Sequence, residues 1–258
     1  MRLEVDKNIT ISENSLLKIT NEDSYHLSID SNNPIYLDIH VYNNCNLTID
    51  CKENSNVELL IVSHKNNLNL EVNVFNNSNV TGIIGHFGNS NINDLINLNE
   101  EYARCELKMV AMANEMDNLN INARLEHNYT DTFGSVKAYC VTNGCGKIIF
   151  DGINHIAQGK ARSNSNLHIR GMILSETSKI AANPALLIDE YDVKANHGAT
   201  VGKISDEGLY YLMSRGITKA DATKLIISGF LIPIVENIKN EDSKEYFQKL
   251  ADLNIKEW

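Results

Sequence analysis

His197 stands out among the residues that could do chemistry, in the stretch DVKANHGATVGKI at residues 192–204. A neutral imidazole is a competent iron ligand. The run GATVG that follows it comes where a strand-forming region gives way to a helical one, so we expect His197 to lie in a strand-to-helix turn. Two interpretations stay open: a metal ligand, or a hydrogen-bonded turn histidine.

Histidine and cysteine elsewhere give weaker candidates. His168 lies in an alternating segment and could serve as a metal ligand, or could simply face solvent. None of the cysteines has the paired short spacing of a zinc site. Cys140 and Cys145 flank the turn-like sequence VTNG, where a thiolate could accept persulfide sulfur. The alternative for both is packing as small apolar side chains.

Charge and motifs exclude several classes of function. A formal net charge of −10 argues against binding to nucleic acid or to an anionic membrane surface. No apolar run is long enough to span a membrane, and the first residues lack the apolar core of a signal peptide, so we expect a cytoplasmic protein. Neither a P-loop nor a nucleophile elbow occurs, so we expect no nucleotide bound by this chain and no catalysis of its own.

Short alternating apolar and polar runs fill residues 1–204, for example YHLSID, IYLDIHVY and NLNLEVNVF. Each predicts a strand with one buried face, and Asn, Ser, Asp and Gly separate the strands. An Asn-rich corner followed by a strand returns after roughly 20 to 30 residues, which is typical of one solenoid rung. A sandwich or a barrel stays open, but the repeat favours an all-β-dominated chain with a β-helix core at residues 1–204, in which stacked asparagines form hydrogen-bonded ladders.

After residue 204 the apolar spacing becomes helical. Ser205 is a candidate N-cap, Thr218 opens a capping-box variant, and Gly216 is a helix-stop residue. A bend or break is expected near Pro233. Residues 205–258 are predicted as a small helical region that either caps the last rung or offers an apolar face to another protein.

The motifs DVK, HGATVG, DEGLYYL, SRGI and GF, in this order between residues 192 and 230, resemble the C-terminal signature of the SufB/SufD family of iron–sulfur cluster assembly proteins. The resemblance covers roughly residues 145–235. Residues 1–140 share with the family only the general pattern of alternating strands and polar turns. It implies a right-handed parallel β-helix followed by C-terminal helices. The His-Gly pair at 197–198 is SufD-like, and the strand pattern begins close to Met1. A short SufD-like or minimal SufBD-like member is therefore expected.

The resemblance also implies partners. Two family members associate through the end of the β-helix, and the C-terminal helices dock an ABC-type ATPase, SufC. Carried onto this chain, docking falls on Leu209, Tyr210, Leu212, Arg215 and Phe230. Ile169 and Ala195 stand where such chains carry cysteines near the subunit seam, which counts against a conventional Cys/His ligand set.

Together these features predict a non-enzymatic scaffold subunit. It would form a homodimer, or a heterodimer with a SufB-like chain, and would transiently hold an iron–sulfur cluster near His197. ATP hydrolysis would belong to the SufC-like partner. Two alternatives stay open: a purely structural subunit without a cluster site of its own, and a polysaccharide-binding β-helix protein.

Overall fold

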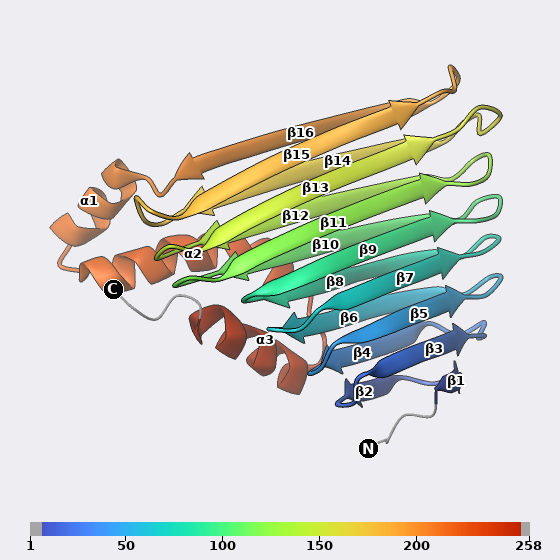
Figure 1. The fold of residues 1–258 in the computed structure, drawn as a ribbon, viewed down its shortest axis with the longest axis horizontal. Helices are drawn as coiled ribbons and strands as arrows, with labels where there is room; N and C mark the ends of the chain where they lie inside the picture. Colours follow the sequence, from blue (N-terminus) through green and yellow to red (C-terminus); the bar gives the residue numbers. More distant parts are fainter. Residues whose placement is uncertain (1–6, 254–258) are drawn as a thin grey trace.

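The computed structural model describes residues 7–253, in which strands β1 to β16 alternate between two sheets (Figure 1). The odd sheet has the order β1-β3-β5-β7-β9-β11-β13-β15, and the even sheet has the order β16-β14-β12-β10-β8-β6-β4-β2. Neighbouring strands within each sheet are parallel. Two successive strands therefore make one rung of a flattened parallel β-helix, and this part of the fold prediction is confirmed.

The strands lengthen along the solenoid, from four residues in β1 to ten in β16. The odd strands are β1 (Asn8–Ile11), β3 (Asp23–Ile29), β5 (Cys45–Cys51), β7 (Leu68–Val74), β9 (Ser90–Leu98), β11 (Asn118–His127), β13 (Lys147–Ile156) and β15 (Lys179–Ile188). The even strands are β2 (Ser15–Ile19), β4 (Ile35–Val41), β6 (Asn56–His64), β8 (Asn79–Phe87), β10 (Arg104–Ala113), β12 (Phe133–Thr142), β14 (Asn164–Ile173) and β16 (Lys194–Lys203).

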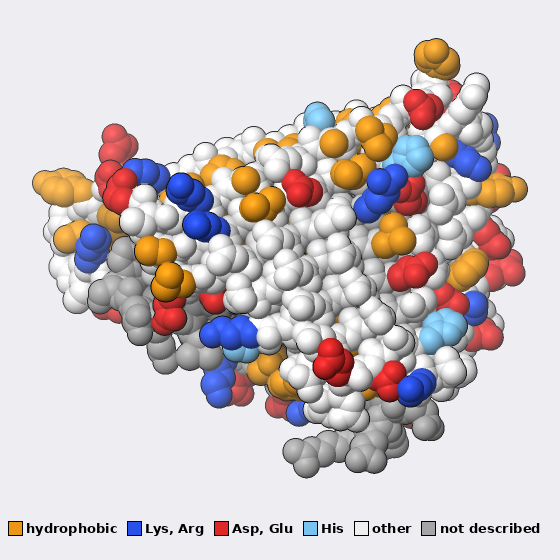
Figure 2. Space-filling model, viewed as in Figure 1, with side chains coloured by type: hydrophobic (Ala, Val, Ile, Leu, Met, Phe, Trp, Pro, Cys, Tyr) orange, Lys and Arg blue, Asp and Glu red, His pale blue; other side chains and the backbone are white. Residues whose placement is uncertain are grey.

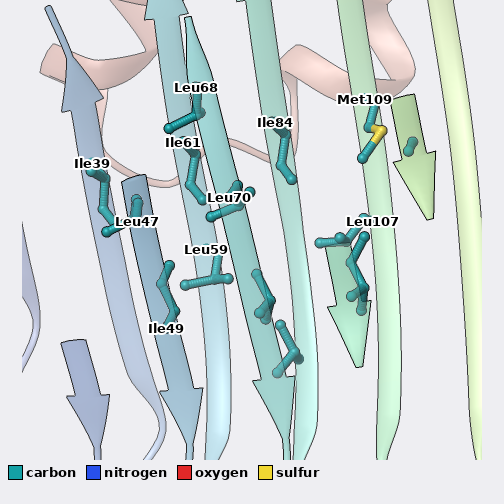
Figure 3. Close-up of a cluster of buried hydrophobic side chains, with 14 of the residues drawn as sticks. Ile39, Leu47, Ile49, Leu59, Ile61, Leu68, Leu70, Ile84, Leu107 and Met109 are labelled. Atoms are coloured by element: carbon teal, nitrogen blue, oxygen red, sulfur yellow. The ribbon is translucent and has the colours of Figure 1, made fainter. Parts of the chain in front are cut away.

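Alternating side chains from the two sheets meet in an apolar interior (Figure 3). Leu47 and Leu70 enter it from the odd sheet, and Ile61, Ile84 and Met109 enter it from the even sheet. Full burial of such a side chain contributes roughly 1.5–3 kcal/mol. Because the side-chain period of a strand is two, this interior fixes the register of every rung.

Asparagine ladders run up the outer surface, as predicted. Asn69 Nδ2 donates to Asn46 Oδ1 over 2.7 Å, across a separation of 23 residues. Asn93 Nδ2 donates to Asn69 Oδ1 over 2.7 Å on the next rung. Further along, Asn120 Nδ2 donates to Asn91 Oδ1 over 3.0 Å, across 29 residues. The outer face of the odd sheet is consequently dominated by uncharged atoms (Figure 2).

Three helices follow the strands: α1 (Asp206–Ser214), α2 (Lys219–Val235) and α3 (Glu241–Leu253). Ser205 Oγ accepts from the Gly208 N–H, and Thr218 Oγ1 accepts from the Asp221 N–H, each over 3.1 Å. Gly216 has a φ of +88°, the left-handed conformation that ends a helix. The predicted caps are confirmed. Within residues 7–253, none of the helices is long and apolar enough to cross a membrane.

Helices α2 and α3 lie across the outer face of the even sheet, behind the strands in Figure 1. Ile227 and Ile234 of α2 are buried there, and Phe247 of α3 meets Phe87 edge-to-face with ring centroids 5.2 Å apart. The expectation that the helical tail caps the last rung is therefore wrong for these two helices. Their apolar residues instead pack against outward apolar residues of the even sheet, such as Val110.

Pro233 does not break α2, which continues for two more residues to Val235. Carbonyl groups near the end of a helix lack partners in the next turn. Here the Pro233 carbonyl accepts from Lys108 Nζ and from Asn237 Nδ2, each over 2.8 Å. A lysine of the even sheet and an asparagine of the following turn thus supply the hydrogen bonds that this carbonyl lacks within the helix.

His127 makes the stability of the fold depend on pH. Its ring is enclosed between the sheets, with Nδ1 2.7 Å from Thr132 Oγ1 and with no hydrogen-bond partner for Nε2 among residues 7–253. Burial, followed by the nearby His155, lowers the pKa of His127 to about 4. The unfolded chain takes up this proton first as pH falls, because its histidine titrates near the ordinary value of about 6.5. Stability is therefore lost between pH about 6.5 and about 4, on the order of 3 kcal/mol.

The variant His127→Gln is expected to flatten this loss, measured as the free energy of unfolding in urea at several pH values. Some slope should remain, because burial also lowers the pKa of His40 to about 4. A profile identical to that of the parent protein would contradict the assignment.

Candidate functional site at the open end of the solenoid

The last rung leaves the interior of the solenoid uncovered. Strand β15 pairs with β13 and β16 pairs with β14, and neither has a described strand on its other side (Figure 1). Ala182 is aligned with the buried Phe150, so both face the interior. We call the interior-facing side of this rung the open end. Its side chains are small or apolar except for a histidine and a lysine: Ile180, Ala182, Pro184, Leu186, Ile188, Ala195, His197, Ala199, Val201 and Lys203.

Gly171 shows how the two strands of the open end meet. A Cβ atom at this position would lie 3.0 Å from Val201 Cγ2 and 3.1 Å from Ile180 Cδ1. Side chains from β16 and β15 thus converge above the glycine and close the interior partly. The remaining apolar surface of the last rung stays exposed or half-buried.

His197 lies within β16, so the expected strand-to-helix turn is wrong. The strand runs on to Lys203 because Gly198 and Gly202 keep extended backbone rather than a left-handed φ. His197 is aligned with Leu167, which is buried in the interior. The imidazole therefore belongs to the open end, where it is exposed and makes no hydrogen bond or ion pair with the described part of the chain.

His168 is on the other side of the same sheet. It is aligned with Gly198, one residue beyond His197, and successive side chains in a strand point to opposite faces. Ile169 and Ala195, at the positions where a cysteine was looked for, face the interior. His168 and His197 therefore do not converge on one ion within a single chain.

The two candidate cysteines occupy different environments. Cys140 is fully buried in the interior, and burial raises the pKa of its thiol to about 12, so that it stays protonated. Cys145 is exposed in the turn between β12 and β13. No group of three or more His, Cys, Asp or Glu side chains that could hold a metal ion occurs among residues 7–253. At the open end, His197 is the one side chain of a type that ordinarily ligates iron, so the described residues of a single chain do not make a metal site there.

A serine, a histidine and an aspartate do come together, but inside the solenoid. His86 Nδ1 lies 2.7 Å from Ser63 Oγ, and His86 Nε2 lies 2.9 Å from Asp94 Oδ2. All three residues are at most 1% exposed. A substrate has no access to them, so we interpret the cluster as an internal polar network. It could not be read from the sequence, because its members come from three different strands.

The predicted docking residues divide between the surface and the core. Tyr210 is 77% exposed, and the exposed Arg215 places its guanidinium 5.3 Å from the Tyr211 ring. Leu209 is buried, Leu212 is half-buried, and Phe230 packs edge-to-face on Tyr139 at 5.4 Å. The i, i+3 spacing of Leu209 and Leu212 marks the inner side of α1. Four further apolar or aromatic residues of α1 and α2 are exposed: Tyr211, Met213, Leu225 and Ile232.

Known proteins resemble this chain over most of its length. A family model described as "SUF system FeS cluster assembly, SufBD core domain" matches residues 4–230, which extends the similarity far upstream of residue 145. The iron–sulfur cluster assembly protein SufD of Bacillus subtilis is 35% identical over 151 residues, which are 58% of this chain and 35% of that protein.

Two further relatives show a similar degree of identity over a similar part of this chain. SufD of Escherichia coli is 29% identical over 161 residues, covering 59% of this chain and 36% of that protein. A SufBD family protein of Mycobacterium bovis is 30% identical over 155 residues, covering 60% of this chain and 18% of that protein. The chain thus spans about a third or less of the length of these relatives. On the match to residues 4–230, the chain belongs to the SufBD core domain family of the SUF system for iron–sulfur cluster assembly.

Proposed function

We propose that this chain is a scaffold subunit on which an iron–sulfur cluster is assembled at a seam between two copies joined through their open ends. The observation that carries the proposal is the uncovered last rung, in which His197 stands among small and apolar side chains. Exposed apolar surface beside unpaired strand edges favours association with another chain.

The symmetry of such a dimer would supply a second imidazole, which one chain lacks at its open end. In a twofold dimer a residue close to the axis appears twice, so two His197 imidazoles can face one another across the seam. Neutral imidazole nitrogen suits iron. Protein-bound clusters ordinarily have four ligands, so two imidazoles leave positions open. This arrangement suits a cluster that is handed on rather than kept, and the cluster is cargo rather than a resident cofactor.

We also propose that α1 forms the binding site for a SufC-like ABC ATPase. Its outer side exposes Tyr210, Tyr211 and Met213, and Leu225 of α2 is exposed as well. Aromatic residues and methionine are enriched at protein interfaces. Deleting residues 205–258 would not test this cleanly, since removing α2 and α3 strips the cover from the apolar outer face of the even sheet.

Tyr210→Glu is the sharper test. Because Tyr210 is 77% exposed, the change leaves the core intact while placing a charge in the centre of the proposed contact. Binding of the cognate ATPase, measured by surface plasmon resonance, is expected to weaken at least about tenfold. Tyr102→Glu, at an exposed tyrosine in the turn between β9 and β10, is the matched control and should bind like the parent chain. Equal binding by both variants would remove α1 from the contact.

A purely structural subunit is the second candidate function. Such a subunit would have the same seam and the same ATPase-binding surface but would not hold a cluster. The reconstitution described in the Discussion distinguishes a cluster-assembling subunit from a purely structural one. Polysaccharide binding has no comparable support. The outward side chains of the odd strands within residues 7–253 include no Phe, Tyr or Trp ring on which a sugar could stack.

A further inference from the structure

A groove of about 530 Å³ lies on the outer face of the even sheet, beside its last strand. It crosses β12, β14 and β16 on the face opposite to His197, so it is separate from the proposed cluster site. Its lining residues are Lys137, Ala138, Tyr139, His168, Ile169, Arg170, Gly198, Ala199 and Thr200. The lining includes no carboxylate, although the chain as a whole carries a formal charge of −10.

Four hydrogen-bonding side chains meet in this groove. Lys137 is aligned with His168 across one strand pair, and Arg170 is aligned with Thr200 across the next. None of the four makes a side-chain hydrogen bond or an ion pair inside the described range. Within residues 7–253, the Arg170 guanidinium lies over the rings of Tyr139, 5.8 Å from its centroid, and of Phe230, 5.3 Å from its centroid. These two rings hold the guanidinium without using its N–H groups.

Basic side chains also follow one another from strand to strand. Lys108 is aligned with Lys137, and Lys137 with His168. Like charges directly opposite each other in a sheet are destabilising. Lys108 is directed to the Pro233 carbonyl, 2.8 Å away, but no such partner serves Lys137. An anion in the groove would remove the repulsion.

Gly198 keeps the groove open next to His168. A Cβ atom at this position would lie 3.4 Å from His168 Nδ1, and the backbone is not left-handed, so a side chain could be accepted here. With glycine, the space in front of the imidazole and of Thr200 is free. The glycine thus leaves room for a ligand between the donors.

We propose that this groove binds a small phosphate-bearing molecule through Lys137, His168, Arg170 and Thr200. Neighbouring strands are about 4.8 Å apart and residues two apart along a strand about 6.7 Å, so the donors surround an area that matches one or two phosphate groups. A guanidinium fork, an ammonium group and a hydroxyl are the side-chain groups that recognise phosphate oxygens. An extended acidic peptide would need a longer row of donors than these three strands offer.

Isothermal titration of the full chain with pyrophosphate, at constant ionic strength, tests the proposal. The expected result is saturable binding of one pyrophosphate per chain, weakened about tenfold or more by Lys137→Gln. The matched control is Lys147→Gln in the odd sheet, where Lys147 is aligned with Lys179 but lies outside the groove. The control should bind like the parent chain.

Gly198→Glu gives an independent arm, because its carboxylate would occupy the groove and pair with the cationic donors. Pyrophosphate binding should be lost while the thermal unfolding midpoint stays close to that of the parent chain. Absence of saturable binding in the parent, unchanged affinity in Lys137→Gln, or an equal loss in Lys147→Gln would each overturn the proposal.

Discussion

Leu186→Asp is expected to convert the proposed dimer of this chain into a monomer. Leu186 is aligned with the buried Asn154, so its side chain belongs to the open end and would enter the proposed seam. An ionised carboxylate in an apolar contact loses its hydration without gaining a partner. Twofold symmetry places the change in the seam twice. The dissociation constant of the dimer should rise roughly 100-fold or more, measured by sedimentation equilibrium.

The neighbouring residue provides the control. Leu187 is 46% exposed and points from β15 to the outer face of the odd sheet, away from the open end. Leu187→Asp therefore introduces the same charge one residue away and should leave the dimer intact. Thermal unfolding of both variants checks that the last rung stays folded. A dimer that survives Leu186→Asp, or that is lost equally in both variants, would contradict the proposed seam.

His197→Ala is expected to abolish cluster formation when the proposed dimer is reconstituted anaerobically with iron and sulfide. His197 is the one side chain of the open end that ordinarily ligates iron, so its loss would remove both protein ligands of the proposed symmetric site. The ligand-to-iron charge-transfer absorption should fall by about tenfold or more, and iron bound per dimer should fall in parallel. The dimer itself should persist, because alanine suits the apolar seam.

Substitutions of two other histidines test whether the effect is specific to His197. His26→Ala removes an exposed histidine in β3, at the opposite end of the solenoid, and should leave the absorption unchanged. His168→Ala tests the weaker candidate on the outer face of the sheet. Loss of the cluster in His168→Ala but not in His197→Ala would move the site away from the seam. An unchanged spectrum in His197→Ala would favour the purely structural subunit.

Much of the fold is encoded locally and could be predicted. Runs such as NLNLEVNVF alternate in polarity with a period of two, and the same pattern buries Leu68, Leu70 and Val72 in β7. The repeating asparagines gave the rung length, since Asn46 and Asn69 meet across 23 residues. Where the tail packs could not be predicted, because the outward apolar residues of the even sheet that hold α2 and α3 look like ordinary strand residues until the register is known.

The candidate site was less accessible from sequence. His197 was selected as a candidate metal ligand, which stays a prediction, but it was expected in a turn and lies within a strand. Only the register with Leu167 shows which way the ring points. The same register separates His168 from His197, and no local pattern could have done so. The unpaired donors around Gly198 come from three strands, so they too become visible only in three dimensions.

Native mass spectrometry of the anaerobically reconstituted protein tests the central claim most directly. We predict that iron and sulfide travel with a species of two chains, each of 28.9 kDa, and not with the single chain. Leu186→Asp should give single chains without iron, and His197→Ala should give paired chains without iron. Iron and sulfide carried by a single chain, or by paired chains that lack His197, would contradict the account.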